Sequence, residues 1–472
     1  MLRTDHFELK ESTEYYIDSY SMLDKSFVES FTVGIPASLN NDMYFEELFF
    51  VENKWILFTT ATCNSGQNTI LYVQYLDNRG QVKNKPKKIA EIPKENTPDD
   101  WFRIIRTGNK ILIEYNRSYL SYNGIPFHIK IINSNLEVTD KWDFVFEKMV
   151  DNPHFRIKKI LMGESGNIYF LTRADLAVKK KKRSPVIKQE NIIFVYNQEQ
   201  GELYDFKIAL KKYVPEDVTF ALNADEEIVV FGFMTPKNRN NLEGIFYQVI
   251  DPRTRKEKFP VTSKYNYMVF SKEQEAEFKS KRSMKAKGNV YEYIPKDIIF
   301  IKNGCSLFIS EQQYRITEKF TDPKTGRDNI IENYYAGDLI LSMGDKDGKI
   351  SWVRRVYKDQ QSIDDDMYYL SYAAINGGNN VKLLYNDNSS NLKKELPDKY
   401  HRIKFVPGKT VKGMAVLASV FKDGRPMKDP AFGHDSKNVV FLPRLIKRTA
   451  DERFIICARQ KNRIRFGTMY FE

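Results

Sequence analysis

The feature that most constrains the fold is a hairpin pattern that recurs along the whole chain. Each copy is an apolar run, a short turn containing Gly, Asn or Asp, and a second apolar run, which is typical of a β-hairpin. The turns follow one another at intervals of about 55 to 80 residues, and such a spacing indicates a repeat architecture. The copies occupy residues 44–60, 101–116, 155–172, 217–234, 297–310, 368–386 and 438–458.

Most of these hairpins are followed by a third apolar run and then by a fourth run that is more polar. Residues 69–82 and 192–206 are examples of the third run and its turn. A more polar fourth strand suits the edge of an antiparallel sheet. Four antiparallel strands per unit, repeated about seven times, predict an all-β fold, a β-propeller with seven four-stranded blades. Six or eight blades stay open at this point.

The two ends of the chain predict how such a ring closes. The seventh unit stops at Glu472 with three strands, and residues 26–36 form a lone strand outside any unit. Pairing this N-terminal strand with the last blade would complete that blade and remove two exposed sheet edges. We therefore expect residues 1–25 to be an N-terminal extension and residues 26–472 to form a single propeller domain.

The remaining length of the chain falls into long links between strands. We expect loop insertions at about 173–191, 262–289, 313–335 and 388–412. In a propeller such links emerge on one face, and variable loops on a rigid scaffold commonly carry binding. Three of these segments together hold more net positive charge than the +12 of the whole chain. The sequence therefore predicts one basic, loop-rich face.

Basic side chains on this face are the candidate binding residues. Their charge favours an acidic polysaccharide or an acidic protein as partner, although lysine-rich loops can also serve solubility alone. The short basic run that begins the set resembles a nuclear import signal, but no nucleic-acid motif accompanies it, so nucleic acid is not expected. The candidates are Lys179, Lys180, Lys181, Lys182, Arg183, Lys393, Lys394, Arg402 and Lys404.

Motifs for catalysis, cofactors and metals are not found in the sequence. The five histidines form no HExxH pair, and no GxSxG or phosphate-binding loop occurs. The DKDG turn around Gly348 resembles a calcium loop, but Met343 and Arg354 stand where oxygen ligands are required. We expect a tight hairpin turn there and a solvated loop at the acidic residues 364–366. The sequence thus predicts no catalytic residue, no cofactor and no metal.

Location is predicted only in part. No run of about 18 apolar residues occurs, so no transmembrane helix is expected. The first residues lack the apolar core of a signal peptide, but a leader already removed would leave the same sequence. Export therefore stays open.

Two stretches resemble a known group of proteins. They are YYAGDLILSMGDKDGKISWVRRVYKDQQ (334–361), followed by YYLSYAAI (368–375), and PRLIKRTADERFIICARQKNRIRFGTMYF (443–471). These residues resemble an uncharacterised exported β-propeller-like family of Bacteroidota-type bacteria, mainly over the C-terminal third. The resemblance implies a periplasmic, outer-membrane-associated or secreted protein, with the cytoplasm as the alternative. It transfers no catalytic residue.

Three functions are compatible with this sequence. The first is a non-catalytic binding or scaffolding module of the cell envelope that recognises an acidic polysaccharide or protein through the basic face. The alternative is a glycan-processing enzyme, a lyase or hydrolase, with carboxylates or His401 near the central channel. The third is a structural subunit that docks through the plain face.

Overall fold

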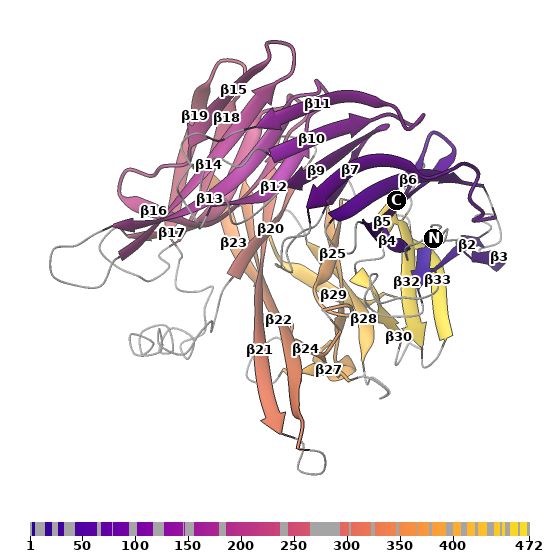
Figure 1. Ribbon diagram of the computed structural model, residues 1–472. Helices are drawn as coiled ribbons and strands as arrows, with labels where there is room; N and C mark the ends of the chain where they lie inside the picture. The colour runs from indigo at the N-terminus through magenta and orange to yellow at the C-terminus, as the bar shows by residue number, and fades with distance from the viewer. Residues whose placement is uncertain are drawn as a thin grey trace. The chain divides into compact units, whose positions relative to one another are not determined.

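The computed structural model of the chain is all-β, with one short 3-10 helix, η4 (Ser389–Asn391), among the described residues (Figure 1). The chain divides into two compact units, Met1–Phe206 and Lys207–Glu472. The structure describes residues 2–4, 15–20, 27–32, 43–63, 68–77, 79–93, 102–116, 127–144, 146, 155–178, 186–236, 244–264, 293–301, 304–321, 326–345, 349–365, 367–376, 380–392, 400–406, 413–420, 423–431, 439–443, 446–448, 454–460 and 463–469.

The first unit holds three four-stranded antiparallel sheets in chain order. The first sheet consists of β4 (Met43–Val51), β5 (Lys54–Cys63), β6 (Asn68–Leu76) and β7 (Lys87–Pro93). The second consists of β8 (Arg103–Thr107), β9 (Lys110–Asn116), β10 (Phe127–Ile132) and β11 (Val138–Phe144). The third consists of β12 (Arg156–Met162), β13 (Ile168–Val178), β14 (Val186–Asn197) and β15 (Glu202–Lys207, which ends one residue into the second unit).

The N-terminal strands form a sheet of their own, and this corrects the expected ring closure. β1 (Leu2–Thr4), β2 (Tyr15–Tyr20) and β3 (Phe27–Thr32) lie in the order β1-β2-β3. β3 pairs with β2, and among the described residues no ladder joins β3 to the last sheet. The prediction that residues 26–36 complete the last blade is wrong, because the nearby run YYIDSY (15–20), rich in strand-forming tyrosine and isoleucine, supplies an antiparallel partner.

The second unit holds four further sheets. The first consists of β16 (Tyr213–Leu222), β17 (Ile228–Pro236), β18 (Gly244–Asp251) and β19 (Lys256–Lys264). The next consists of β20 (Tyr293–Phe300), β21 (Ser306–Thr321), β22 (Asp328–Gly344), β23 (Ile350–Val356), β24 (Gln360–Ile363) and β27 (Ile403–Phe405). Then follow β25 (Tyr372–Asn376), β26 (Val381–Asp387), β28 (Met414–Val420) and β29 (Pro426–Pro430). The last consists of β30 (Val439–Phe441), β31 (Lys447–Arg448), β32 (Phe454–Gln460) and β33 (Arg463–Met469).

All seven hairpins predicted from the repeat are confirmed as antiparallel strand pairs. They are β4/β5, β8/β9, β12/β13, β16/β17, β20/β21, β25/β26 and β30/β32. The DKDG turn is also confirmed as a hairpin, since it joins the paired strands β22 and β23. The residues that flank this turn are joined by a hydrogen bond, which the Lys349 amide donates to Asp345 Oδ1 at 2.8 Å. An aspartate at the start of a turn commonly accepts such a bond.

Two segments expected as loop insertions are instead largely strand. Residues 313–335 form the outer halves of β21 and β22, which pair from Ser306/Gly344 out to Thr321/Asp328 and extend beyond their neighbours in Figure 1. Most of 173–191 belongs to β13 and β14. The segment 388–412 contains η4 and β27, which pairs in parallel with β24. In residues 313–335 the β-branched and aromatic side chains favour a continued hairpin over a loop.

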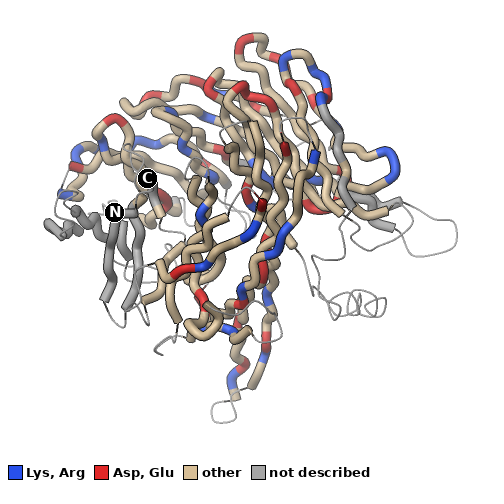
Figure 2. Tube along the Cα trace, turned by 180° about the vertical axis from the view of Figure 1, so that it is seen from behind, with Lys and Arg blue, Asp and Glu red and all other residues tan. Residues whose placement is uncertain are grey.

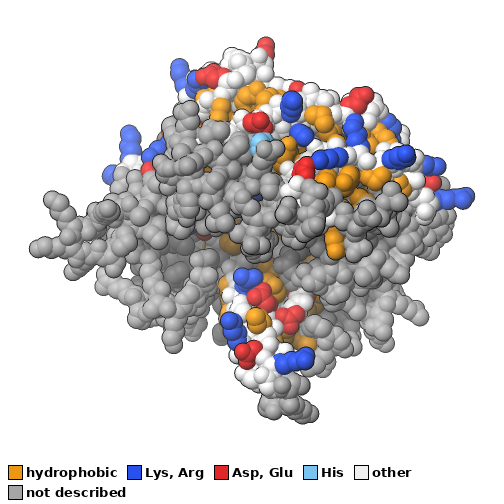
Figure 3. Space-filling view, in the orientation of Figure 1, with side chains coloured by type: hydrophobic (Ala, Val, Ile, Leu, Met, Phe, Trp, Pro, Cys, Tyr) orange, Lys and Arg blue, Asp and Glu red, His pale blue; other side chains and the backbone are white. Residues whose placement is uncertain are grey.

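The described surface mixes both signs of charge. Lys and Arg residues are interspersed with Asp and Glu along the described chain (Figure 2), and hydrophobic side chains lie between them on the face seen in Figure 3. Much of the predicted basic face falls outside the described residues. Among the residues described, no helix is long and apolar enough to cross a bilayer.

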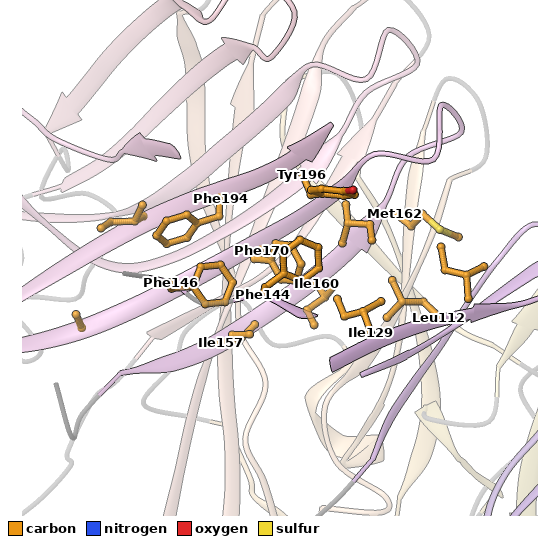
Figure 4. Packing of buried hydrophobic residues seen from close by; sticks show 14 residues of the cluster. Leu112, Ile129, Phe144, Phe146, Ile157, Ile160, Met162, Phe170, Phe194 and Tyr196 are labelled. Carbon is orange, nitrogen blue, oxygen red and sulfur yellow. The ribbon is translucent and has the colours of Figure 1, made fainter. Parts of the chain in front are cut away.

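The core of each unit lies between consecutive sheets. In the first unit Leu112 and Ile129 of the second sheet share a buried cluster with Ile160 and Phe170 of the third (Figure 4). Phe146 packs against this cluster, with its ring centroid 5.5 Å from that of Phe170. In the second unit similar clusters join the sheet of β16–β19 to that of β20–β23, and the latter to that of β25–β29. Face-to-face burial of this kind is how stacked sheets form a core.

Candidate functional site

Side chains alternate between half-buried and buried along residues 357–360 of the second unit, and Gln361 and Ser362 beyond them are both buried. Lys358, Gln360 and Ser362 are fully buried, whereas Tyr357 and Asp359 between them are partly exposed. This is the period of two that an extended backbone imposes. Residues 402–405 also alternate, since Ile403 and Phe405 are buried and Arg402 and Lys404 are exposed, whereas His401 before them is exposed as well. The two segments contact each other: the ring centroids of Tyr357 and Tyr400 are 5.8 Å apart, and Arg402 bonds to Asp359.

The inward side chains hold this part of the sheet in place. Lys358 Nζ lies 2.6 Å from Glu311 Oε1, and both side chains are fully buried. Lys358 also donates to the carbonyl of Ala336 at 3.2 Å. Gln360 Nε2 donates to the carbonyl of Asn386 at 2.7 Å. A buried charge that keeps its partner and its hydrogen bonds is tolerated, whereas removal of either partner leaves an uncompensated charge.

On the outer side, two tyrosines meet a lysine from β29. Lys428 Nζ donates to the carbonyl oxygen of Tyr357 at 2.8 Å and to the phenol oxygen of Tyr400. The same Nζ atom lies 4.8 Å from the ring centroid of Tyr400 and 5.9 Å from that of Tyr385. Tyr357, Tyr400 and Lys428 are half-buried. We call Tyr357, Tyr385, Asp387, Tyr400 and Lys428 the tyrosine–lysine cluster.

Behind the lysine lies a buried carboxyl group. Asp387 is almost fully buried, and its Oδ1 accepts bonds from the Asn388 amide at 2.8 Å and from Asn391 Nδ2 at 2.7 Å. Its other oxygen, Oδ2, and the hydroxyl of Tyr385 are buried without a hydrogen-bond partner among the described residues. Unpaired buried polar atoms are uncommon and are often associated with function.

The burial of these groups shifts their proton affinities. Burial raises the pKa of Asp387 to about 6, although Lys428 and the bond from Asn391 act against this rise. Burial lowers the pKa of Lys428, and the negative charges of Asp387 and Asp338 oppose the change. Burial, and then the charge of Asp387, raises the pKa of the Tyr400 phenol. A desolvated amine, a phenol and a carboxyl group therefore lie together with perturbed affinities, as is common at functional sites.

An arginine–aspartate pair supports one edge of the cluster. Arg355 Nε donates to Asp338 Oδ2 at 2.8 Å, and the Lys358 amide donates to Asp338 Oδ1 at 3.1 Å. The Arg355 guanidinium lies 4.6 Å from the ring centroid of Tyr357. Because this arginine is already bonded and nearly buried, its role is to hold Tyr357 and not to contact a ligand.

The arrangement can both donate and accept a proton. A phenol with a raised pKa stays protonated at neutral pH and can act as an acid. An amine with a lowered pKa has a larger neutral fraction and can act as a base. Their hydrogen bond allows a proton to pass directly between the two groups.

The predicted binding residues have different outcomes. Lys179–Arg183 and Lys393–Lys394 lie outside the described residues. Arg402 is exposed, donates from Nε to Asp359 Oδ1 at 2.8 Å, and lies over the ring of Tyr335 at 5.3 Å. Lys404 is exposed on β27. Their role in binding stays a prediction.

His401, the histidine of the alternative hypothesis, follows Tyr400 directly and is exposed. Its backbone amide donates to Asn391 Oδ1 at 2.8 Å, and its carbonyl accepts from Asn391 Nδ2 at 2.8 Å. Among the described residues no group of three or more His, Cys, Asp or Glu side chains could hold a metal ion. Of the acidic residues 364–366, Asp364 follows β24 and bonds to Glu332 of β22, whose amide donates to Asp364 Oδ1 at 2.7 Å.

The tyrosine–lysine cluster was not predicted from the sequence. Tyr400 and Lys428 are 28 residues apart and Lys428 and Tyr357 are 71 apart, so no local motif joins them. The run YKDQQS (357–362) holds no apolar residue after Tyr357, and in YHRIKF (400–405) only Ile403 and Phe405 alternate with polar residues. Neither run marks its tyrosine as part of a site.

Comparisons with known proteins give only loose structural likenesses. Neither a protein-family model nor a curated protein matches the chain. A solved polysaccharide lyase, Uly1, is 8% identical with a TM-score of 0.42, covering 100% of this chain and 99% of that one. A PL25 ulvan lyase bound to a GlcA–Rha3S chain is 8% identical with a TM-score of 0.38, covering 88% and 89%. A thermostable family-43 glycoside hydrolase is 10% identical with a TM-score of 0.29, covering 72% and 95%. All three TM-scores are below one half, so these likenesses fix neither blade number nor activity.

Proposed function

We propose that this chain is a lyase that cleaves an acidic, uronate-containing polysaccharide by β-elimination at the tyrosine–lysine cluster. The observation that carries the proposal is the hydrogen bond between Lys428 Nζ and the Tyr400 phenol oxygen, in a half-buried setting that perturbs both groups. Seven of the eight described sheets, those from β4 onward, follow one another along the chain and pack face to face inside each unit, which supports a propeller as the scaffold of this site.

The elimination uses both partners of that hydrogen bond. Neutral Lys428 accepts the proton from the carbon next to the uronate carboxylate. The electron pair forms a carbon–carbon double bond, and the glycosidic carbon–oxygen bond breaks. Tyr400 donates its proton to the leaving oxygen. The proton on Lys428 then passes to the Tyr400 phenolate along their hydrogen bond, which restores both groups for the next cycle.

The same cluster supports hydrolysis less well. Glycoside hydrolases require two carboxyl groups that flank the scissile bond. The two carboxyl groups here, on Asp338 and Asp387, are buried and bonded to Arg355 and to Asn391. The enzyme hypothesis is thus favoured in its lyase form. The partner that it implies, an acidic polysaccharide, is the same as in the binding-module hypothesis, and such polymers point to an exported protein.

Removal of the acid or the base tests the proposal. We expect Tyr400→Phe and Lys428→Met each to lower the initial rate by about 10²- to 10⁴-fold, the range for loss of a general acid or base. The measurement is the ultraviolet absorbance of the conjugated double bond formed on polygalacturonate, alginate, hyaluronan or a sulfated glucuronate–rhamnose polymer.

Tyr213→Phe is the matched control, because Tyr213 is a half-buried tyrosine of β16 in the same unit. It should cleave as the wild type does. Thermal unfolding of each variant shows whether it is folded. Full activity in well-folded Tyr400→Phe would remove Tyr400 as the acid.

A further inference from the structure

A second aromatic group lies on the outer face of the same sheet. Tyr314 of β21 stands opposite Tyr335 of β22, Tyr335 stands opposite Gln361 of β24, and Gln361 is aligned with Lys404 of β27. Residues that pair across strands point to the same face of a sheet. Four adjacent strands therefore place tyrosines and a cation in one row.

The contacts in this row hold the two rings firmly. The rings of Tyr314 and Tyr335 stack with centroids 4.5 Å apart at an angle of 11°. Gln361 Nε2 donates to the Tyr335 hydroxyl at 3.1 Å. The Arg402 guanidinium lies 5.3 Å from the Tyr335 centroid and bonds to Asp359. Fixed rings lose little side-chain entropy when a ligand binds, which favours affinity.

The face continues outward along the hairpin with exposed apolar side chains. Ile316 and Phe320 follow Tyr314 at even spacing on β21, so they point to the same side, and they are 43% and 45% exposed. Glu318 lies between them and is also exposed. In Figure 3 the projecting lower part of the molecule shows hydrophobic side chains among charged ones. We call Tyr314, Ile316, Phe320, Tyr335, Arg402 and Lys404 the hairpin platform.

We propose that the hairpin platform binds the part of an acidic polysaccharide chain that extends beyond the tyrosine–lysine cluster. The inference rests on the proposed function, since it takes the same polymer as ligand. The flat carbon faces of sugar rings suit tyrosine and phenylalanine rings, while uronate carboxylates suit the guanidinium and ammonium groups at the β27 end.

The hairpin platform lies next to the tyrosine–lysine cluster, and this favours a polysaccharide over a second copy of the chain as its ligand. Tyr400 and Arg402 lie two residues apart, and Tyr400 contacts the neighbouring segment through the ring of Tyr357, with centroids 5.8 Å apart. Tyr357 and Asp359 are also two residues apart, and Asp359 contacts Arg402. A polymer bound at Tyr400 would therefore contact the positive charge of Arg402 next, and then the aromatic ring of Tyr335.

Binding is tested apart from turnover on the full chain carrying Tyr400→Phe. The readout is retardation in native gels that contain polygalacturonate, alginate or hyaluronan. Tyr335→Ala and Arg402→Gln should each raise the dissociation constant by about 10-fold, whereas Tyr335→Phe should keep near-normal retardation because it retains the ring. Phe50→Ala is the control, since Phe50 is an exposed aromatic residue of the first unit.

The outcomes separate this inference from the proposed function. In one outcome the polymer retards the chain, Tyr335→Ala and Arg402→Gln weaken the retardation, and the wild type releases no unsaturated product. That outcome supports binding at the hairpin platform and contradicts the lyase proposal. If the wild type cleaves the polymer but Tyr335→Ala and Arg402→Gln, with unchanged thermal midpoints, are retarded like the parent, the platform is overturned. Retardation by none of the three polymers, or concentration-dependent dimerisation that Tyr335→Ala abolishes, also overturns it.

Discussion

At the scale of single residues, the protonation of Asp387 is coupled to folding in the acidic pH range. Burial raises its pKa from 3.8 to about 6. The folded chain therefore binds this proton more tightly than the unfolded chain does. Between about pH 4 and pH 6 the folded state holds more protons, so the contribution of Asp387 to stability falls as pH rises through that window.

Asp387→Asn should remove this dependence. The loss of unfolding free energy between about pH 4 and pH 7 is expected to be smaller in the variant than in the wild type by about 3 kcal/mol, since each pKa unit is worth about 1.4 kcal/mol. Urea unfolding at the two pH values measures the difference. Asp429→Asn, an exposed site on β29, is the matched control. An identical pH dependence in wild type and Asp387→Asn would contradict the assignment.

At the scale of elements, the turn between β28 and β29 positions the lysine. Gly424 in this turn has φ of +79°, and a Cβ atom there would lie 2.6 Å from Cε3 of Trp352. A side chain at this position faces two costs, a backbone conformation that suits glycine and an overlap with a ring that cannot simply swing away.

Gly424→Ala should therefore lower the free energy of unfolding by about 2 to 4 kcal/mol, and cleavage should fall because β29 carries Lys428. Gly201→Ala separates the two costs. Gly201 also has a positive φ of +64°, but a Cβ atom there would meet no described atom within 4 Å. That variant should lose only about 1 to 2 kcal/mol, the cost of the left-handed backbone conformation for a residue with a Cβ atom. Urea unfolding measures the free energy that each variant loses. Equal losses for Gly424→Ala and Gly201→Ala would contradict an overlap of the side chain introduced at position 424 with the ring of Trp352.

Some elements could be predicted from the sequence, and others could not. The seven hairpins could be predicted because alternating apolar residues and Gly or Asp turns act over a few positions. The partner of β3 was missed because the run YYIDSY (15–20), although rich in strand-forming tyrosine and isoleucine, lies outside the repeat. The outer halves of β21 and β22 were missed because their charged residues resemble a loop. The cluster of Tyr400 and Lys428 could not be predicted, since strand register at long range brings those side chains together.

At the scale of the whole molecule, the chain is a succession of sheets whose stability comes from burial between neighbours within each unit. Phe170 lies at the centre of one such interface. It is fully buried and contacts Phe144 and Phe146, with ring centroids 5.3 and 5.5 Å away. Its strand, β13, is buried on both faces, as Tyr169 and Leu171 are also inaccessible.

Phe170→Ala should lower the free energy of unfolding by about 3 to 5 kcal/mol, because it leaves a cavity between two sheets. Phe50→Ala, at a 44% exposed site, should lower it by about 1 kcal/mol or less. Chemical denaturation of both variants gives the comparison. A loss at Phe170 no larger than at Phe50 would contradict the packing of consecutive sheets as the source of stability.

The proposed β-elimination is tested most directly by the chemical structure of the products. The measurement is mass spectrometry of the oligosaccharides released from uronate polymers by the full chain and by Tyr400→Phe. Elimination predicts new ends that carry a double bond and weigh one water molecule less than hydrolysis products, made by the wild type and lost in the variant. Saturated ends, or no cleavage of any polymer, would contradict it.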